Sequence, residues 1–363
     1  MPQGDDLDAR EAVLARVELW RRRAPRLVDD TITMAHGAGG RASQSLLEAV
    51  IRPAFSNPML DELEDGAVLD VGDGSRMAIT TDAFVVTPRR FPGGSIGDLA
   101  VNGTINDLAT MGAAPSALMV SLVLEEGLEV DELRSIIDDL AHAAARAGVP
   151  IVTGDTKVVE RGAADGCYVT TSGIGRIVPQ ARLGMDMVQP TDAIVLSGTI
   201  GDHGVSVMVA RGELELMADV RSDTAPLHLL VAALLEAVPS TRWMRDPTRG
   251  GVASACNELA VSSGLGVEID EQSIPVRGPV AGACELLGLD PLYIANEGKL
   301  IAVVPADETD AAVRTLRRCE HGTDACVVGT ITEDHPGLVV ARTDFGGTRI
   351  VDMLVGDPLP RIC

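Results

Sequence analysis

The chain alternates short apolar runs with longer stretches in which hydrophobic residues recur at helical spacing. The short runs have the length of strands, and they cover 77–86, 117–124, 149–153, 167–174, 191–197 and 292–295. The run 149–153 predicts a buried strand. Helical spacing predicts a long amphipathic helix over about 129–147 and another helix within 93–113.

The length of the chain predicts more than one hydrophobic core. At 363 residues it exceeds the size that one core usually serves, and about 150 residues per domain predicts two domains. Near the start, apolar residues at helical spacing are followed by three arginines, which suit the end of a helix. We therefore expect a helical extension at 1–30, a first domain at 31–180, a second domain at 181–345 and a mobile tail at 346–363.

Composition excludes several classes of protein. No apolar run approaches the roughly 18 to 20 residues that cross a bilayer, and the acidic start lacks the features of a secretory signal, so we expect a cytoplasmic protein without a membrane segment. A net charge of −23 and an aromatic content of 2% disfavour nucleic-acid binding. Six widely spread cysteines indicate free thiols in a reducing compartment.

Acidic and amide residues interrupt the apolar pattern of the first half. Asp82 lies inside an apolar strand, where an aspartate is costly to bury unless it is paired or binds a cation. The helix within 93–113 carries Asp98, Asn102, Asn106 and Asp107 on neighbouring turns. Oxygen ligands from several elements predict a magnesium site that bridges to a nucleotide phosphate. The alternative is a polar ladder that faces solvent.

Further candidates stand beside glycine-rich turns or at predicted strand ends. Asp155 and Lys157 follow the run 149–153, where a surface ion pair is the alternative, and Glu297 follows the run 292–295. Asp65 lies at a strand edge, with a solvated strand end as its alternative, and Asp246 is a further oxygen ligand candidate. The sequence lacks a P-loop, it has no strand-borne G-x-S-x-G motif of a Ser-His-Asp hydrolase, and Cys319, His321 and Cys326 lack a fourth zinc partner.

The chain ends on Cys363, behind Pro358 and Pro360. The prolines bar a helix and keep the backbone extended, so they present the terminal thiol on a stalk. We interpret Cys363 as a group that carries the substrate, although a terminal residue of no consequence is the alternative.

Eight motifs together carry a resemblance to a known family. They are HGAGG, TDAFVV, GDLAVNGTINDLATMGA, TGDTKVV, GDHG, RDPTRGG, NEGK and the terminal PRIC. With them the chain resembles the HypE family of hydrogenase maturation proteins, in the superfamily of aminoimidazole ribonucleotide synthetase and selenophosphate synthetase. The match runs from about 31 to 363, and Arg41 departs from it because a lysine is often found there.

The resemblance implies a two-domain α/β (α+β) fold in which each domain has a mixed β-sheet covered by helices. It implies a homodimer formed through the first domains, ATP and Mg²⁺ as cofactors, and ATP-dependent dehydration of an S-carbamoyl group on Cys363 to a thiocyanate. A HypF-like carbamoyltransferase would load the thiol. Cyanide would then pass to iron held by a HypC/HypD-like complex, for the active site of a [NiFe]-hydrogenase.

The resemblance also implies roles for individual residues. Glu297 and Lys157 match positions that remove protons from the carbamoyl nitrogen, although Lys157 could instead hold phosphate charge. The residues implied at the magnesium and ATP site are Asp65, Asp82, Asp107 and Asp246, with Gly94, Gly97, Asn106 and Asp155 as nucleotide neighbours.

Two other functions remain open from the sequence. A selenophosphate synthetase-like enzyme would need a reactive cysteine near its start, and no cysteine precedes Cys167. A maturation scaffold without turnover would not need the carboxylates, Lys157 or Cys363. ATP hydrolysis would separate an enzyme from such a scaffold.

Overall fold

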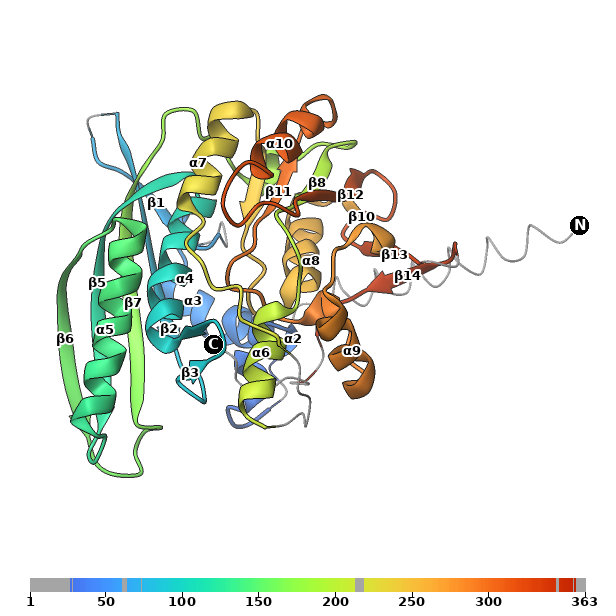
Figure 1. The fold of residues 1–363 in the computed structure, drawn as a ribbon. Coiled ribbons are helices and arrows are strands. Elements are labelled where there is room, and N and C mark those ends of the chain that lie inside the picture. Colours follow the sequence, from blue (N-terminus) through green and yellow to red (C-terminus); the bar gives the residue numbers. More distant parts are fainter. Residues whose placement is uncertain are drawn as a thin grey trace, which may run out of the picture.

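A computed structural model describes residue 27 and residues 29–60, 64–72, 74–212, 219–343, 346–354 and 356. Apart from residues 27, 29 and 30, the helical extension expected at 1–30 lies outside the described residues, and so does Cys363. Figure 1 shows two sheet-containing halves that meet along helix α4. No helix in the described ranges combines the length and the apolar character needed to pass through a bilayer.

The first half contains a five-stranded sheet in the order β1-β2-β7-β5-β6. All neighbouring strands are antiparallel except β5 and β6, which are parallel. The bounds are β1 Ala67–Asp70, β2 Arg76–Phe84, β5 Ala113–Glu125, β6 Ile151–Val159 and β7 Cys167–Ile177.

Two helices, α4 (Ile96–Thr110) and α5 (Val130–Ala147), cover one face of this sheet. Helix α5 buries an apolar stripe that includes Ile136 and Leu140, and it ends at Gly148, whose φ of 68° is favourable for glycine. Helix α4 is buried on almost every side because it lies between the first sheet and the second half. Its side chains can therefore contribute to a site at the junction.

The second half contains a seven-stranded sheet in the order β14-β13-β10-β12-β8-β11-β9. Helix α8 packs on one face of the sheet, and α7 and α10 pack on the other. The strands are β8 Ala193–Leu196, β9 Trp243–Arg245, β10 Gly266–Asp270, β11 Ile301–Val304, β12 Cys326–Thr332, β13 Val339–Arg342 and β14 Thr348–Val351. The helices are α6 Asp202–Ala210, α7 His228–Ala237, α8 Gly251–Ser263, α9 Gly278–Leu287 and α10 Thr309–Leu316.

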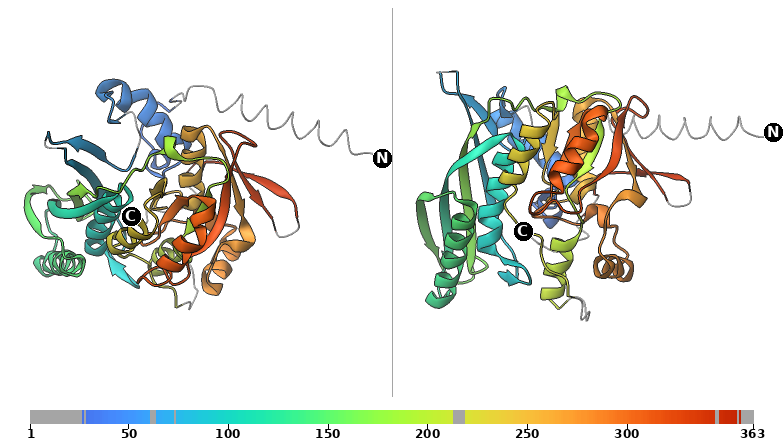
Figure 2. Two further views of the ribbon diagram at one scale, coloured as in Figure 1. Left: turned by 90° about the horizontal axis from the view of Figure 1, so that it is seen from above. Right: turned by 45° about the horizontal axis from the view of Figure 1, so that its top comes forward.

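A short N-terminal segment precedes the first sheet and lies beside the junction of the two halves (Figure 2, blue). It consists of a 3-10 turn, Met34–Gly37, then α2 (Arg41–Leu46), a π-helical turn (Leu47–Ile51) and α3 (Arg52–Phe55). The remaining elements are the ribbon of β3 (Arg90–Phe91) and β4 (Gly94–Ser95) and the 3-10 turns Met185–Met187, Glu271–Ser273, Pro291–Tyr293 and Ala306–Glu308.

The structure confirms the mixed sheets covered by helices and corrects three local predictions. The run 292–295 is not a strand: Asp290 Oδ1 accepts the N–H of Leu292 at 2.9 Å and caps the 3-10 turn Pro291–Tyr293. The run 149–153 is not a buried strand, because β6 begins at Ile151 at the edge of the sheet and is exposed along most of its length. Residues 348–351 are not part of the mobile tail predicted at 346–363, because they form β14 and pair with β13.

Candidate active site

Aspartates from both halves meet at the junction. Asp65 precedes β1, Asp107 lies near the end of α4, and Asp246 follows β9. One carboxylate oxygen of each lies within 4.8 Å of those of the other two. Asp82 on β2 hydrogen-bonds to Asp107. We call these four residues the aspartate cluster.

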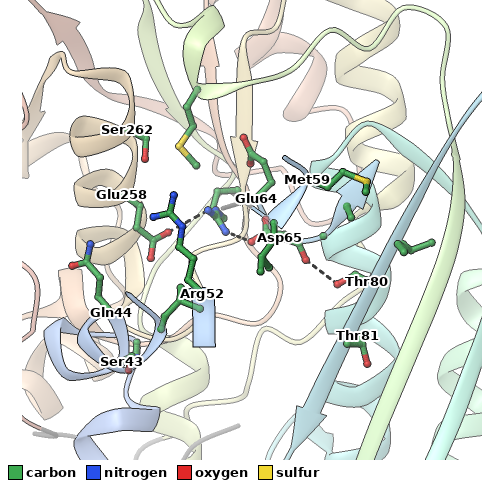
Figure 3. Close-up of a pocket in the computed structure, with 18 of the residues that line it drawn as sticks. Ser43, Gln44, Arg52, Met59, Glu64, Asp65, Thr80, Thr81, Glu258 and Ser262 are labelled. Atoms are coloured by element: carbon green, nitrogen blue, oxygen red, sulfur yellow. Dashed lines mark hydrogen bonds and ion pairs between the residues drawn. The ribbon is translucent and has the colours of Figure 1, made fainter. Parts of the chain in front are cut away.

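Threonine hydroxyls fix the orientation of the cluster. Thr80 Oγ1 donates to Asp107 Oδ2 and approaches the backbone oxygen of Asp65, both at 2.8 Å. Thr110 Oγ1 lies 3.1 Å from Asp65 Oδ2. Figure 3 shows Asp65 and Thr80 in contact beside the cavity. These contacts are possible because α4 packs directly on β2.

The electrostatics of the aspartate cluster favour a bound cation. Burial raises the pKa of Asp107 and of Asp246 well above the usual range, and neighbouring carboxylates raise both further. Burial also raises the pKa of Asp82, although the hydrogen bond to Asp107 and the charge of Arg249 oppose the rise. Because Mg²⁺ prefers hard oxygen ligands and would relieve this repulsion, the residues fit that ion.

Two arginines lie near the cluster, and their charges act on its acids. Arg245 is paired with Asp65 and, at 3.2 Å, with Glu258. Arg249 Nη1 donates to the backbone oxygen of Gly37 at 3.2 Å, and its charge lowers the pKa of Asp82 and of Glu297. Sequence reasoning did not single out Arg249, although the RDPTRGG motif contains it.

Two adjoining cavities open beside the cluster. A polar pocket of about 240 Å³ lies between the glycine-rich turn at 36–40 and the segment 245–249. A larger cavity of about 1030 Å³ shares Gly39, Asp65 and Arg245 with it and is bounded by α2, α8 and the first sheet (Figure 3). Many side chains that line this second space are apolar, and they include Leu47, Met59, Leu60, Ile79, Met119, Ile174 and Val261. We call it the apolar cavity.

Close backbone packing holds the glycine-rich turn in place. A Cβ on Gly39 would lie 2.9 Å from the Cβ of Arg249, and one on Gly40 would lie 2.5 Å from the backbone oxygen of Leu354. The N–H of Arg41 donates to that same oxygen at 3.0 Å. The chain after β14 is therefore anchored beside the polar pocket.

Glu297 lies on the second-half side of the junction and is only 2% exposed. Burial raises its pKa well above the usual value, and the charges of Asp246, Asp223 and Asp82 raise it further. The structure thus brings Glu297 near the aspartate cluster. It places the residue in a loop after a 3-10 turn rather than at the end of a strand.

The other predicted nucleotide neighbours of the first half have local packing roles. A Cβ on Gly97 would lie 2.7 Å from the Cβ of Asp139 on α5, and one on Gly94 would lie 2.6 Å from Thr224 Cγ2. Neither glycine lines the polar pocket or the apolar cavity. Asn106 is fully buried, and backbone groups at 225, 227 and 297 occupy its amide.

Asp155 and Lys157 lie away from the cluster within one chain. They pair with Ser121 and Val123 of β5. Val120 and Leu122, which alternate with those two residues, are buried toward the helices, so Asp155 and Lys157 are on the opposite face of the sheet. Strands β7 and β5 separate β6 from β2. Both residues lie within β6, whereas the sequence had suggested that they follow the end of a strand.

Comparison with known proteins identifies the family. Two family models match, "AIR synthase related protein, N-terminal domain" over residues 63–177 and "AIR synthase related protein, C-terminal domain" over residues 189–341. The carbamoyl dehydratase HypE of Rhodobacter capsulatus is 50% identical over 340 residues, which cover 93% of this chain and 99% of the relative. The chain belongs to the HypE family. The HypE of Azotobacter vinelandii is 49% identical over 337 residues, covering 93% and 98%.

Solved HypE structures share the fold. HypE in a HypE–HypF complex aligns with a TM-score of 0.81 at 43% identity, covering 85% of this chain and 99% of that chain. HypE in complex with ATP aligns with a TM-score of 0.77 at 43% identity, covering 92% and 100%. The predicted two-domain fold is confirmed. A selenophosphate synthetase-like function is not favoured, because these near-full-length relatives are HypE proteins.

Proposed function

We propose that this chain uses ATP to dehydrate an S-carbamoyl group on Cys363 to a thiocyanate, which supplies cyanide to the iron of a [NiFe]-hydrogenase. The observation that carries the proposal is Glu297, a buried acid beside the aspartate cluster. Dehydration of an amide needs a base in a site shielded from water, next to a site for phosphoryl transfer. Membership of the HypE family supports the same reaction.

ATP would occupy the two adjoining cavities. The apolar cavity, of about 1030 Å³, has the size and lining that suit a purine base, and the polar pocket leads from it to the carboxylates. Mg²⁺ held by Asp65, Asp107 and Asp246 would neutralise phosphate charge, and Asp82 would support these ligands through Asp107. Arg249 lines the polar pocket and would contact the γ-phosphate.

The reaction would proceed in two stages. The carbamoyl oxygen attacks the γ-phosphorus of ATP, the bond from that phosphorus to the bridging oxygen breaks, and ADP leaves. The C–O bond then breaks with release of phosphate, while the nitrogen loses its protons and its electrons complete the C≡N bond. Phosphorylation is needed because an amide oxygen is a poor leaving group. Glu297 accepts a proton, and Lys157 either accepts one or neutralises phosphate.

The anchored segment after β14 favours Cys363 as the carrier. The backbone oxygen of Leu354 accepts the N–H of Arg41 beside the glycine-rich turn. The nine residues at 355–363 would extend at most about 30 Å from that anchor. This reach would let the thiol approach the polar pocket and also a separate loading enzyme. The proposed loader is a HypF-like carbamoyltransferase, and the proposed cyanide acceptor is a HypC/HypD-like iron complex.

We propose a homodimer formed through the first-half sheets. Strand β6 is an edge strand that exposes Val152 by 59% and Val158 by 64%. Stable proteins usually cover such an apolar edge. A second copy would also bring its Lys157 toward a site that this chain's own Lys157 does not reach.

Co-expression of Lys157→Ala and Glu297→Gln chains tests the shared site. If each site combines Lys157 of one copy with Glu297 of the other, mixed dimers regain one intact site, giving about a quarter of the wild-type dehydration rate in a random mixture. Each variant alone should be inactive. A mixture that stays inactive, although mass analysis finds mixed dimers, would contradict the shared site.

Phosphate release from ATP tests the reaction itself. The carbamoylated chain should release phosphate from ATP, while Cys363→Ala and the uncarbamoylated wild type should release little. Cys326→Ala is a matched control, because it removes a partly buried thiol that bonds the backbone oxygen of Ser273 away from the site. Equal phosphate release by the wild type and by Cys363→Ala, after both have been treated with the carbamoyl-loading enzyme, would contradict the assignment of the carrier.

A further inference from the structure

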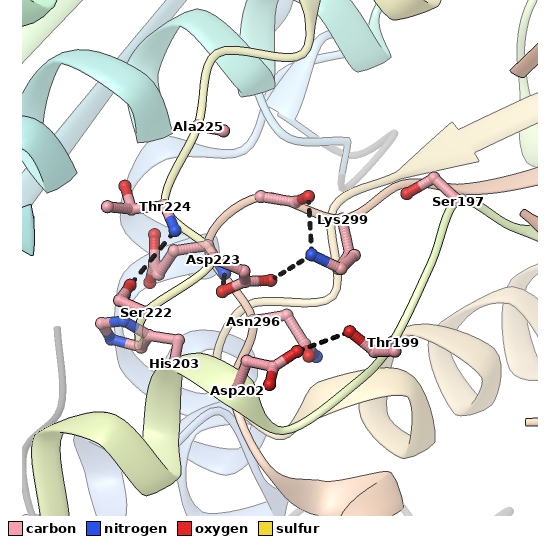
Figure 4. Close-up of polar contacts among 12 residues, drawn as sticks. Ser197, Thr199, Asp202, His203, Ser222, Asp223, Thr224, Ala225, Asn296 and Lys299 are labelled. Atoms are coloured by element: carbon pink, nitrogen blue, oxygen red, sulfur yellow. Dashed lines mark hydrogen bonds and ion pairs between the residues drawn. The ribbon is translucent and has the colours of Figure 1, made fainter. Parts of the chain in front are cut away.

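The backbone of Glu297 is held by Asp223, which lies in the loop at 222–227 and forms a buried ion pair with Lys299. Asp223 Oδ1 accepts the N–H of Glu297 at 3.1 Å. Asp223 Oδ2 accepts from Lys299 Nζ at 2.9 Å (Figure 4). The side chains of Asp223 and Lys299 are only 5% and 10% exposed. Burial raises the pKa of Asp223, but Lys299 and His203 outweigh that effect and hold the pKa below its usual value.

An amide from the first half holds the other side of the same residue. Asn106 Nδ2 donates to the backbone oxygen of Glu297 at 3.3 Å and to that of Ala225 at 3.1 Å. Asn106 Oδ1 accepts the N–H of Leu227 at 2.8 Å. Because backbone groups occupy both ends of this amide, Asn106 is a link between α4 and the two loops of the second half.

The two loops approach each other as closely as their backbones allow. A Cβ on Gly298 would lie 1.8 Å from the backbone oxygen of Asp223, so only glycine fits at that position. The N–H of Ala225 also donates to the backbone oxygen of Glu297, at 3.4 Å. Burying an ion pair is costly in free energy, and it gains little stability over apolar residues of similar size. The arrangement is therefore better explained by what it holds in place.

We propose that Asn106, Asp223 and Lys299 are positioning residues that hold Glu297 from both sides and keep its carboxylate directed at the carbamoyl group. We call these three residues the Glu297 clamp. The inference rests on the proposed function and extends it to residues that do not touch the substrate. It also gives Asn106 a role different from the nucleotide contact that the family resemblance implied.

Single-turnover dehydration by Asp223→Asn tests the clamp. The variant places an amide against Lys299, so the loop should shift, and a shift of about 1 Å at a reacting group costs about 10²-fold in rate. We expect dehydration of the preloaded S-carbamoyl chain to slow by about that factor at saturating ATP, while the Kd for ATP stays within about 2-fold. Lys299→Met should behave like Asp223→Asn, and Lys299→Arg should restore most of the rate.

Asp192→Asn is the matched control. Asp192 is also buried, accepts a backbone N–H from Gln189 at 2.8 Å and pairs with Arg242 at 3.0 Å, but it is outside the junction. It should lower the melting temperature about as much as Asp223→Asn and leave the dehydration rate unchanged.

The outcomes separate the clamp from the proposed function. A folded Asp223→Asn chain that dehydrates at the wild-type rate overturns the clamp. The clamp is also overturned if Asp192→Asn slows dehydration as much as Asp223→Asn does. It is overturned as well if Asp223→Asn loses ATP affinity by the same factor as it loses dehydration rate, because the effect would then be general destabilisation. If the wild type itself does not dehydrate, the proposed function fails, and the clamp fails with it.

Discussion

The aspartate cluster and the Glu297 clamp lie in the same junction, yet they treat buried carboxylates in opposite ways. In the cluster, acids face one another, and the pKa values of Asp107 and Asp246 rise well above their usual range. In the clamp, Lys299 pairs with Asp223, whose pKa is lowered. This difference supports our proposal that the cluster receives a cation, whereas the clamp pairs its charges internally and holds its neighbours.

Glu297→Gln should have the largest effect. Glutamine keeps the shape of the side chain and the clamp on its backbone but cannot accept a proton. We expect the rate of S-carbamoyl dehydration to fall by about 10³-fold with little change in ATP affinity, as measured by single-turnover mass spectrometry. A residual rate within 10-fold of wild type would show that another group is the base.

Mg²⁺ should stabilise the folded chain through the aspartate cluster and not through the acid of the Glu297 clamp. Saturating Mg²⁺ at about 100 times its Kd should raise the free energy of unfolding of the wild type by about 2.7 kcal/mol. Asp246→Asn should lose most of this gain, while Asp223→Asn should keep it. Thermal unfolding with Mg²⁺ or with a chelator measures both. An equal gain in both variants would place the ion elsewhere.

Arg249→Met should lower kcat/KM for ATP by about 10-fold, because a charge-assisted contact to a phosphate is lost. Arg249→Lys should keep part of the rate. The control is Arg242→Met, since Arg242 pairs with Asp192 outside the junction. Steady-state kinetics with varied ATP measures the effect, and equal losses in the two methionine variants would count against a phosphate contact.

The pH dependence of stability should have opposite signs for Glu297 and for Asp223, with effects of order 1 kcal/mol. Because the folded pKa of Glu297 is raised, the native state keeps a proton that the unfolded state loses above about pH 4.5, and the free energy of unfolding falls as pH rises through that window. The folded pKa of Asp223 is lowered, so its contribution is present above pH 3.8 and is lost as pH falls below that value.

Urea unfolding of the metal-free chain across pH measures these contributions. Glu297→Gln should flatten the decline above pH 4.5, and Asp223→Asn should flatten the loss at the acid end. If Asp223→Asn instead flattens the decline above pH 4.5, the opposite treatment of the two acids is contradicted.

The sequence correctly predicted elements that have a clear hydrophobic period or a long apolar run. The amphipathic stripe at 129–147 became α5, and the apolar run at 117–124 became part of β5. The prediction of a strand failed at 292–295, where four apolar residues follow Asp290-Pro291 and the aspartate caps a 3-10 turn. The prediction of a buried strand also failed at 149–153, because an apolar run does not reveal that β6 is an edge strand with one neighbour.

The candidate site was predicted in part. Asp82 was found because an acid within an apolar strand is unusual, and Asp107 because it belongs to the polar positions of a helix. The family resemblance implied one site for these two with Asp65 and Asp246, and the structure gathers all four. Asp223 was missed because its partner Lys299 is 76 residues away and its own segment contains only a polar turn. Resemblance assigned Asn106 to a site, but it could not show which atoms the amide bonds.

Mass analysis of the C-terminal peptide tests the central claim most directly. The purified chain would be loaded by a HypF-like carbamoyltransferase with carbamoyl phosphate, and then given ATP and Mg²⁺, beside Cys363→Ala and Glu297→Gln. The account predicts a carbamoyl adduct on Cys363 that loses the mass of one water only when both ATP and Glu297 are present. An unmodified Cys363 in a chain that still consumes ATP would contradict it.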